Sequence, residues 1–336
     1  MTNSKLHDRP PHEADTAVVS VRRGYLWIPG DRVETDEGTV QAGPMFVHWE
    51  APPRVTQPYP LVLVHGGGGQ GTDWLVTPDG RPGWASAFVE SGFAVYVVDR
   101  PGHGRSPLHP AAFGAIGSQL TYQAARELFL AGNSPEQHSQ WPFSRDPGGA
   151  EVEQLLAGMG PLPADLCYSQ ELDAARISKL LALLGRSIMV THSAGAPGGW
   201  LAADRNPGLV HAIAAIEPVG PPFAEIPGIG TLTWGLTTAP MTFDPPGDTA
   251  EDIRKRSDSE RRLPRMKDLP VRAFTGGASA FAGYMGEIVD FLNLGGADSD
   301  WLHLPAIDIH GNGHGLIFER NSDDTVKPVI DWLRNV

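Results

Sequence analysis

Residues Ser187–Gly199 read S-I-M-V-T-H-S-A-G-A-P-G-G, and the remaining elements can be placed from this stretch. The apolar run Ile188–Val190 is typical of a buried strand. A sharp turn centred on Ser193 follows, and small residues then lead into a predicted helix. A serine on such a strand-to-helix turn is a nucleophile elbow, usually written G-x-S-x-G. Thr191 replaces the first glycine, so the stretch alone does not distinguish an elbow from an ordinary turn.

Composition limits the classes of protein to consider. The chain has 336 residues and 41% hydrophobic content, enough for one large α/β domain with an insertion. Its net charge of −13 argues against nucleic acid or an anionic membrane as a partner. The single cysteine, Cys167, excludes an intrachain disulfide and a cysteine metal cluster. Residues Met1–Asp15 contain no apolar segment typical of a secretory signal, which predicts a cytoplasmic protein.

Strand-like and helix-like segments alternate along most of the chain, which predicts a mostly parallel sheet with helices on both faces. Residues 17–28 and Gly38–Glu50 are expected to form an antiparallel edge. The further predicted strands are Pro60–Val64, Phe93–Val98, the run before the elbow, Val210–Ile216, Val271–Thr275 and Trp301–Leu304. The predicted helices are Trp84–Ser91, Gln170–Leu184, Phe281–Leu294 and Val326–Arg334.

Two segments interrupt this alternation. We expect residues 107–170 to form a lid over the carboxyl-terminal edge of the sheet, with helices at Gln119–Ala131 and Ala150–Met159. A proline-rich flap, 221–270, contains a charged helix near Ala250–Arg262. The predicted core is therefore 17–106 with 171–336, after a disordered tail at 1–16. The aromatic residues predicted to line a substrate pocket are Trp74, Trp141 and Phe143, although the lid aromatics could equally form the lid's own small core.

A glycine-rich loop, His65–Gly71, follows the first predicted central strand. It lacks the G-x-x-x-x-G-K pattern of a phosphate-binding loop, and it does not lead directly into a helix as a dinucleotide fingerprint does. Bare backbone N–H groups would suit an oxyanion loop, where negative charge develops during acyl transfer. Asp99 and His103, after the next strand, are interpreted as structural residues that shape a turn.

A serine nucleophile needs a base and an acid, and the sequence supplies candidates for both. His314 and His310 follow the last strand, and His314 is favoured because glycines flank it just before the terminal helix. The usual position of the acid, Gly276–Ser279, contains no carboxylate. Glu217 ends an earlier strand and is the preferred acid. Asp308 and Glu319 are the alternatives.

Several motifs in the same order resemble a group of bacterial α/β-hydrolase esterases with a Ser–Glu–His triad, whose glutamate follows the sixth strand. The matching stretches are Trp27–Gly30, Tyr59–Trp84, G-H-G-R-S, T-H-S-A-G, I-E-P and L-P-A-I-D-I-H-G-N-G-H. The resemblance implies Ser193 as nucleophile, Glu217 as acid and His314 as base, with the N–H groups of Gly67 and Ala194 as oxyanion donors. That group can carry adjacent cysteines where this chain has Gly67 and Gly68.

The predicted function is hydrolysis of a small-molecule carboxylic ester or lactone through an acyl-enzyme, without a cofactor or metal. The alternatives are cleavage of a C–C or amide bond, a lyase reaction, or a non-catalytic binding protein on the same fold. Dehalogenase and epoxide hydrolase chemistry is disfavoured because their elbow nucleophile is aspartate. The exposed N-terminal strand pair could also support a homodimer.

Overall fold

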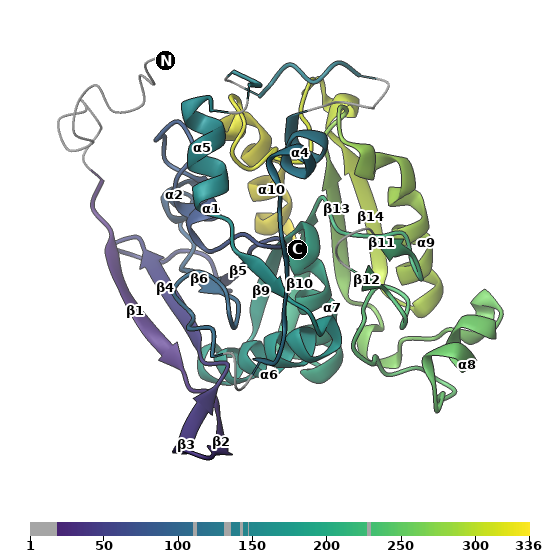
Figure 1. The fold of residues 1–336 in the computed structure, drawn as a ribbon. Coiled ribbons are helices and arrows are strands. Elements are labelled where there is room, and N and C mark those ends of the chain that lie inside the picture. Colours follow the sequence, from purple (N-terminus) through teal and green to yellow (C-terminus); the bar gives the residue numbers. More distant parts are fainter. Residues whose placement is uncertain (1–18, 110–112, 131–135, 142–143, 147, 227–229) are drawn as a thin grey trace.

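The computed structural model describes residues 19–109, 113–130, 136–141, 144–146, 148–226 and 230–336. Its centre is an eight-stranded sheet in the order β1-β4-β6-β5-β9-β10-β13-β14 (Figure 1). Strands β1, β4 and β6 pair antiparallel, and all the remaining pairs of this sheet are parallel. The strands are β1 (Arg22–Ile28), β4 (Met45–Ala51), β5 (Leu61–Val64), β6 (Val95–Asp99), β9 (Ser187–His192), β10 (Val210–Ile216), β13 (Pro270–Thr275) and β14 (Asp298–His303). The predicted mostly parallel sheet with an antiparallel edge is confirmed.

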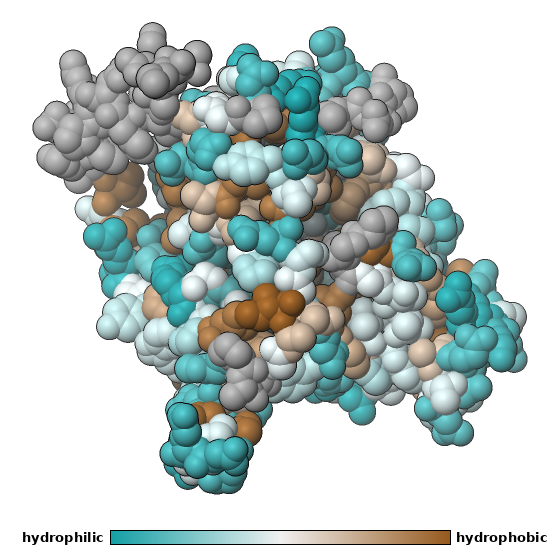
Figure 2. Space-filling model, in the orientation of Figure 1, coloured by the Kyte–Doolittle hydropathy of each residue, from teal (hydrophilic) through white to brown (hydrophobic). Residues whose placement is uncertain are grey.

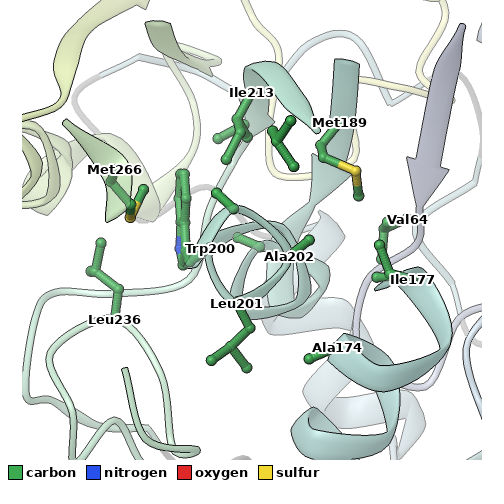
Figure 3. Packing of buried hydrophobic residues seen from close by; sticks show 14 of the residues in the cluster. Val64, Ala174, Ile177, Met189, Trp200, Leu201, Ala202, Ile213, Leu236 and Met266 are labelled. Carbon is green, nitrogen blue, oxygen red and sulfur yellow. The ribbon is translucent and has the colours of Figure 1, made fainter. Parts of the chain in front are cut away.

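Helices cover both faces of this sheet. Residues of α6 (Leu166–Leu184), α7 (Ala196–Arg205) and α9 (Met285–Gly295) form one buried cluster with one face of the strands. Residues of α1 (Thr72–Leu75), α2 (Trp84–Glu90), α5 (Ala150–Ala157) and α10 (Ser322–Asn335) form a second cluster with the other face. In Figure 3, Trp200 extends from α7 toward Met266 and Leu236, so α7 also anchors the segment that follows β10. The helix after the elbow is thus buried on several sides.

The region predicted as one strand over Gly38–Glu50 is divided, and that prediction is wrong. A hairpin of β2 (Asp31–Thr35) and β3 (Gly38–Ala42) precedes β4. The division falls at Gly43, whose φ of +54° breaks the extended chain before Pro44. The buried Arg176 guanidinium donates to the carbonyls of Ala42 and Gly43, which fixes the break. The hairpin projects from the body, and its surface is largely hydrophilic (Figure 2).

The insertion between β6 and α6 also differs from the prediction. Within the expected helix over Gln119–Ala131, the structure has the end of β7 (Ile116–Gln119), the short α4 (Tyr122–Ala125) and a π-helical turn, Arg126–Leu130. Strand β7 pairs with β8 (Pro161–Pro163), so the insertion closes on itself before α6. The second insertion helix, predicted over Ala150–Met159, is α5 (Ala150–Ala157), which starts at the predicted residue and ends two residues earlier. Ala131 lies outside the described residues.

The segment after β10 contains short elements. Strands β11 (Glu225–Ile226) and β12 (Gly230–Thr231) form a small ribbon. The predicted charged helix over Ala250–Arg262 is shorter, because α8 (Ala250–Lys255) ends at Lys255 and a separate 3-10 turn, Asp258–Glu260, starts at a new capping box. The boundaries of the lid, flap and core stay predictions, and the predicted tail over 1–16 lies outside the described residues.

Candidate active site

Ser193 occupies a strained turn between β9 and α7. Its φ is +52°, in the left-handed region that non-glycine residues rarely adopt. The turn packs so tightly that a Cβ atom on Gly195 would lie 2.3 Å from the His65 carbonyl oxygen. Only glycine fits at that position. This backbone geometry is that of a nucleophile elbow, in which strain projects the serine hydroxyl above the sheet edge.

The structure brings the predicted serine, histidine and glutamate together. Ser193 Oγ lies 2.9 Å from His314 Nε2, and His314 Nδ1 lies 3.5 Å from Glu217 Oε2. All three side chains are buried. The fold thus brings His314 into contact with Ser193, 121 residues away in sequence, and with Glu217, 97 residues away. The arrangement has the connectivity of a nucleophile, a base and an orienting acid.

Glu217 is held in place by the loop where the acid was first expected. The residue follows β10 with a φ of +49°. Its Oε1 accepts a hydrogen bond from the Gly276 N–H at 2.7 Å, and its Oε2 accepts from the Ser279 hydroxyl. Burial raises the pKa of the Glu217 carboxyl to about 8, and these two hydrogen bonds act against that shift. The loop after β13 therefore supplies donors in place of a carboxylate.

His314 lies in an apolar and aromatic enclosure. The rings of Phe281 and Phe129 are centred 4.2 and 5.4 Å from the imidazole. Burial lowers the pKa of His314 to about 3, so the ring is neutral at ordinary pH and can accept a proton. His192, which the sequence analysis did not single out, donates through Nε2 to the His314 carbonyl at 3.0 Å. Its only sequence signal is its position beside the elbow serine.

The two predicted oxyanion donors lie next to each other. A Cβ atom on Gly67 would lie 3.2 Å from the Ala194 Cβ atom, and one on Gly66 would lie 3.1 Å from the Ser193 Cβ atom. The glycine loop therefore runs directly alongside the nucleophile. Leu162 of β8 lies 3.8 Å from the same Gly67 position, so the insertion covers this part of the site.

The alternative base and acids lie elsewhere. His310 is more than half exposed and pairs with Glu136 at 2.6 Å. Asp308 is exposed at the end of a 3-10 turn. Glu319 is buried but accepts hydrogen bonds from His138, Asn312 Nδ2 and the Gly313 N–H. Within the part of the chain that the structure describes, none of these three side chains hydrogen-bonds to Ser193 or His314.

Asp99 and His103 occupy the structural positions expected of them. Asp99 accepts from the Gly71 N–H at 2.7 Å and pairs with Arg105, which ties the glycine loop to the turn after β6. His103 contacts the Pro101 carbonyl oxygen within its own turn. Burial lowers the pKa of His103 well below its usual value, so this ring is neutral.

The aromatic residues predicted to line a pocket are buried where they are described. Trp74 is fully buried and packs against Trp84 and edge-on to His192. Trp141 is buried edge-on to Phe318. Phe143 lies outside the described residues. Their role in binding substrate stays a prediction.

Among the described residues, no group of three or more histidine, cysteine, aspartate or glutamate side chains is arranged to hold a metal ion. No described helix is both long and apolar enough to cross a membrane.

A mostly parallel sheet with a serine elbow at its carboxyl edge defines a hydrolase-type α/β protein. The model of the α/β hydrolase fold family matches residues 59–275. A protein described as probable secreted lipase phiG, from Fungal sp. (strain ATCC 74256), is 30% identical over 98% of this chain and 93% of its own. The chain belongs to the α/β hydrolase fold family.

The same fold occurs in a solved structure described as a novel bacterial esterase. It aligns with 96% of this chain and 98% of its own at a TM-score of 0.70, with 21% sequence identity. The alignment includes the sheet and both helical layers. At 21% identity, it shows that the two proteins share a fold.

Proposed function

We propose that this protein is a serine carboxylic ester hydrolase that acts through an acyl-enzyme. The observation that carries the proposal is the 2.9 Å contact between Ser193 Oγ and His314 Nε2, on an elbow whose backbone is held in the left-handed region. A neutral, buried imidazole at that distance can take the serine proton as the hydroxyl attacks a carbonyl carbon. The names of the similar proteins, a lipase and an esterase, support an ester as substrate.

In the proposed mechanism, Glu217 makes protonation of His314 possible. Burial disfavours the imidazolium alone and the carboxylate alone, as the two opposed pKa shifts indicate. Proton transfer from Ser193 makes His314 an imidazolium, and the negative charge that forms with it lies on the oxygen of the attacked carbonyl. An ionised Glu217 carboxylate beside His314 Nδ1 compensates the positive charge of the imidazolium. The distance of 3.5 Å between Nδ1 and Oε2 would shorten as the imidazolium forms.

The N–H groups of Gly67 and Ala194 are proposed to stabilise the oxyanion of the tetrahedral intermediate. Each such donor contributes about 3–4 kcal/mol to the transition state in comparable sites. Collapse of the intermediate breaks the bond to the alkoxide oxygen, which takes the proton from His314 Nε2 and leaves as the alcohol. Water then attacks the acyl-serine with His314 again as base, and the acid product leaves.

The experiment is turnover of a graded series of acyl esters and lactones by the wild type and Ser193→Ala, together with labelling by a serine-directed fluorophosphonate. We expect Ser193→Ala to lower kcat by about 10⁶-fold and to abolish labelling. Labelling that persists in Ser193→Ala would place the nucleophile elsewhere. Turnover of amides or C–C substrates in preference to esters would favour the alternative bond classes.

The substrate class, the oligomeric state and the cellular location of the protein remain to be tested. The substrate is proposed to be a small-molecule ester, and a homodimer through the edge strand β1 stays a prediction. The predicted cytoplasmic location also stays a prediction. Because the fungal relative is described as secreted, fractionation of producing cells should compare the enzyme in the medium with that in the cell.

A further inference from the structure

A second buried histidine–glutamate pair lies beside the loop that carries His314. His138 Nε2 is 2.7 Å from Glu319 Oε1, and the two side chains are 2% and 0% exposed. His138 belongs to the insertion, whereas Glu319 lies three residues before the start of α10. Burying a carboxylate raises the free energy of the folded state unless hydrogen-bond donors surround it. The donors around Glu319 therefore offset the cost of burying its carboxylate.

Glu319 fixes the backbone immediately before the catalytic histidine. The Gly313 N–H donates to both of its carboxylate oxygens, at 3.0 and 3.2 Å, and Asn312 Nδ2 donates to Oε2 at 2.8 Å. The Asn312 carbonyl in turn accepts from the Ala278 N–H at 2.8 Å, within the loop that holds Glu217. One carboxylate therefore links the loop of the base to the loop that supports the acid.

The insertion segment 138–140 is hydrogen-bonded along the same loop. The N–H groups of Ser139 and Gln140 both donate to the Gly311 carbonyl at 3.0 Å, and the Gln140 side chain donates to the His310 carbonyl. The insertion segment and the loop pack so closely that neither Gly311 nor Gly313 could carry a side chain without displacing its neighbours. A Cβ atom on Gly311 would lie 2.0 Å from Ser139 Oγ, and one on Gly313 would lie 2.9 Å from His138 Nε2.

This loop needs support from outside because it reads G-N-G-H-G from Gly311 to Gly315. Glycines on both sides of His314 leave its backbone with unusual conformational freedom. We propose that Glu319 and His138 are positioning residues for His314, and that the insertion thereby holds the base against Ser193. This inference rests on the proposed function.

The first test is Glu319→Gln, which keeps the side-chain volume but replaces one accepting oxygen with a donating nitrogen. That nitrogen faces N–H donors on every side, so the loop should shift. We expect kcat to fall by about 10²-fold with little change in KM, as for small misplacements of a catalytic group. The rate of Ser193 labelling by fluorophosphonate should fall by the same factor, because labelling also needs His314 as base.

The second test separates the hydrogen bond from packing. His138→Gln retains an N–H donor near Glu319, whereas His138→Phe retains a ring without one. We expect His138→Gln to keep most of the wild-type kcat and His138→Phe to lose it. The matched control is His310→Gln, because the His310–Glu136 pair joins the same two segments but its histidine is 57% exposed. This control should leave kcat unchanged.

All rates are normalised to folded protein, measured by thermal unfolding monitored by circular dichroism. A folded Glu319→Gln with wild-type kcat and labelling rate would overturn the inference, as would equal kcat values in the two His138 variants. If Glu319→Gln does not fold, the His138 pair makes the same comparison. A wild type that neither cleaves esters nor becomes labelled would instead overturn the proposed function, and that result is independent of every variant.

Discussion

Thr191 on β9 fills the space left by Gly199 on α7, since Thr191 Cγ2 lies 2.8 Å from where a Cβ atom on Gly199 would be. The usual elbow pattern begins with glycine because strand and helix approach closely there. In this chain the small residue is on the helix instead of the strand. The departure from G-x-S-x-G is therefore compensated eight residues later, and the close approach is preserved.

Gly199→Ala should consequently destabilise the protein. Crowding against Thr191 should cost about 1–3 kcal/mol, more than the gain of up to about 1 kcal/mol in helix propensity. Adding Thr191→Ala should restore much of the loss, so urea unfolding of the double-mutant cycle should show strong coupling. The control is Gly286→Ala in α9, where nothing lies within 4 Å of the new Cβ atom. Additive effects in the cycle would contradict this explanation of the elbow.

Glu217→Gln should nearly abolish turnover while leaving the fold intact. Its amide oxygen can still accept from the Gly276 N–H, but its nitrogen would donate toward His314 Nδ1 and favour the tautomer protonated at Nε2. That tautomer cannot accept the Ser193 proton, and kcat should fall by about 10⁴-fold. Steady-state kinetics on the best ester substrate provide the measurement. Near-normal turnover would mean that another group serves as the acid.

The same variant should be more stable than the wild type at alkaline pH. The pKa of folded Glu217 is raised by burial from 4.5 to about 8, so ionisation is disfavoured in the folded state. The stability contributed by the protonated form is complete below pH 4.5 and is lost as pH rises to about 8. Glutamine does not ionise, so the difference between variant and wild type should grow across this window, by at most about 1.4 kcal/mol per pH unit.

Urea unfolding at a series of pH values measures that difference. Ser193→Ala is the control, because it also removes activity but changes no carboxyl group, and its stability difference should not vary with pH. A Glu217→Gln difference that is constant from pH 4 to 9 would mean that the carboxyl ionises with equal ease in the folded and unfolded chains.

Gly67→Ala should impair catalysis more than binding. The new methyl group would lie 3.2 Å from the Ala194 Cβ atom and should push the two proposed oxyanion donors apart. We expect kcat to fall by about 10²-fold with a smaller change in KM, measured beside Gly286→Ala. A rise in KM alone would argue that Gly67 contacts the substrate and not the oxyanion.

The sequence predicted the core strands and the meeting of Ser193, Glu217 and His314 because apolar runs in parallel strands end at one sheet edge. The break at Gly43, between the β2–β3 hairpin and β4, was missed, since a strand break at glycine resembles an ordinary turn. Ser279 gave no signal, because its role depends on a carboxylate 62 residues away. His138 and Glu319 are joined across 181 residues, and no local pattern encodes such a contact.

The proposed acid, Glu217, lies outside the loop after β13, and this placement has a consequence for how the enzyme could change. The loop after β13 gives Glu217 only one N–H and one hydroxyl, and it lines a cavity of about 600 Å³ with Ser279, Ala280, Ala282 and Trp301 among its walls. If the acid were on this loop, remodelling the cavity wall would also move its charge. In this chain the proposed acid is not itself part of the wall, so Ala280 and Ala282 can be varied while Gly276, Ser279 and the proposed triad stay fixed.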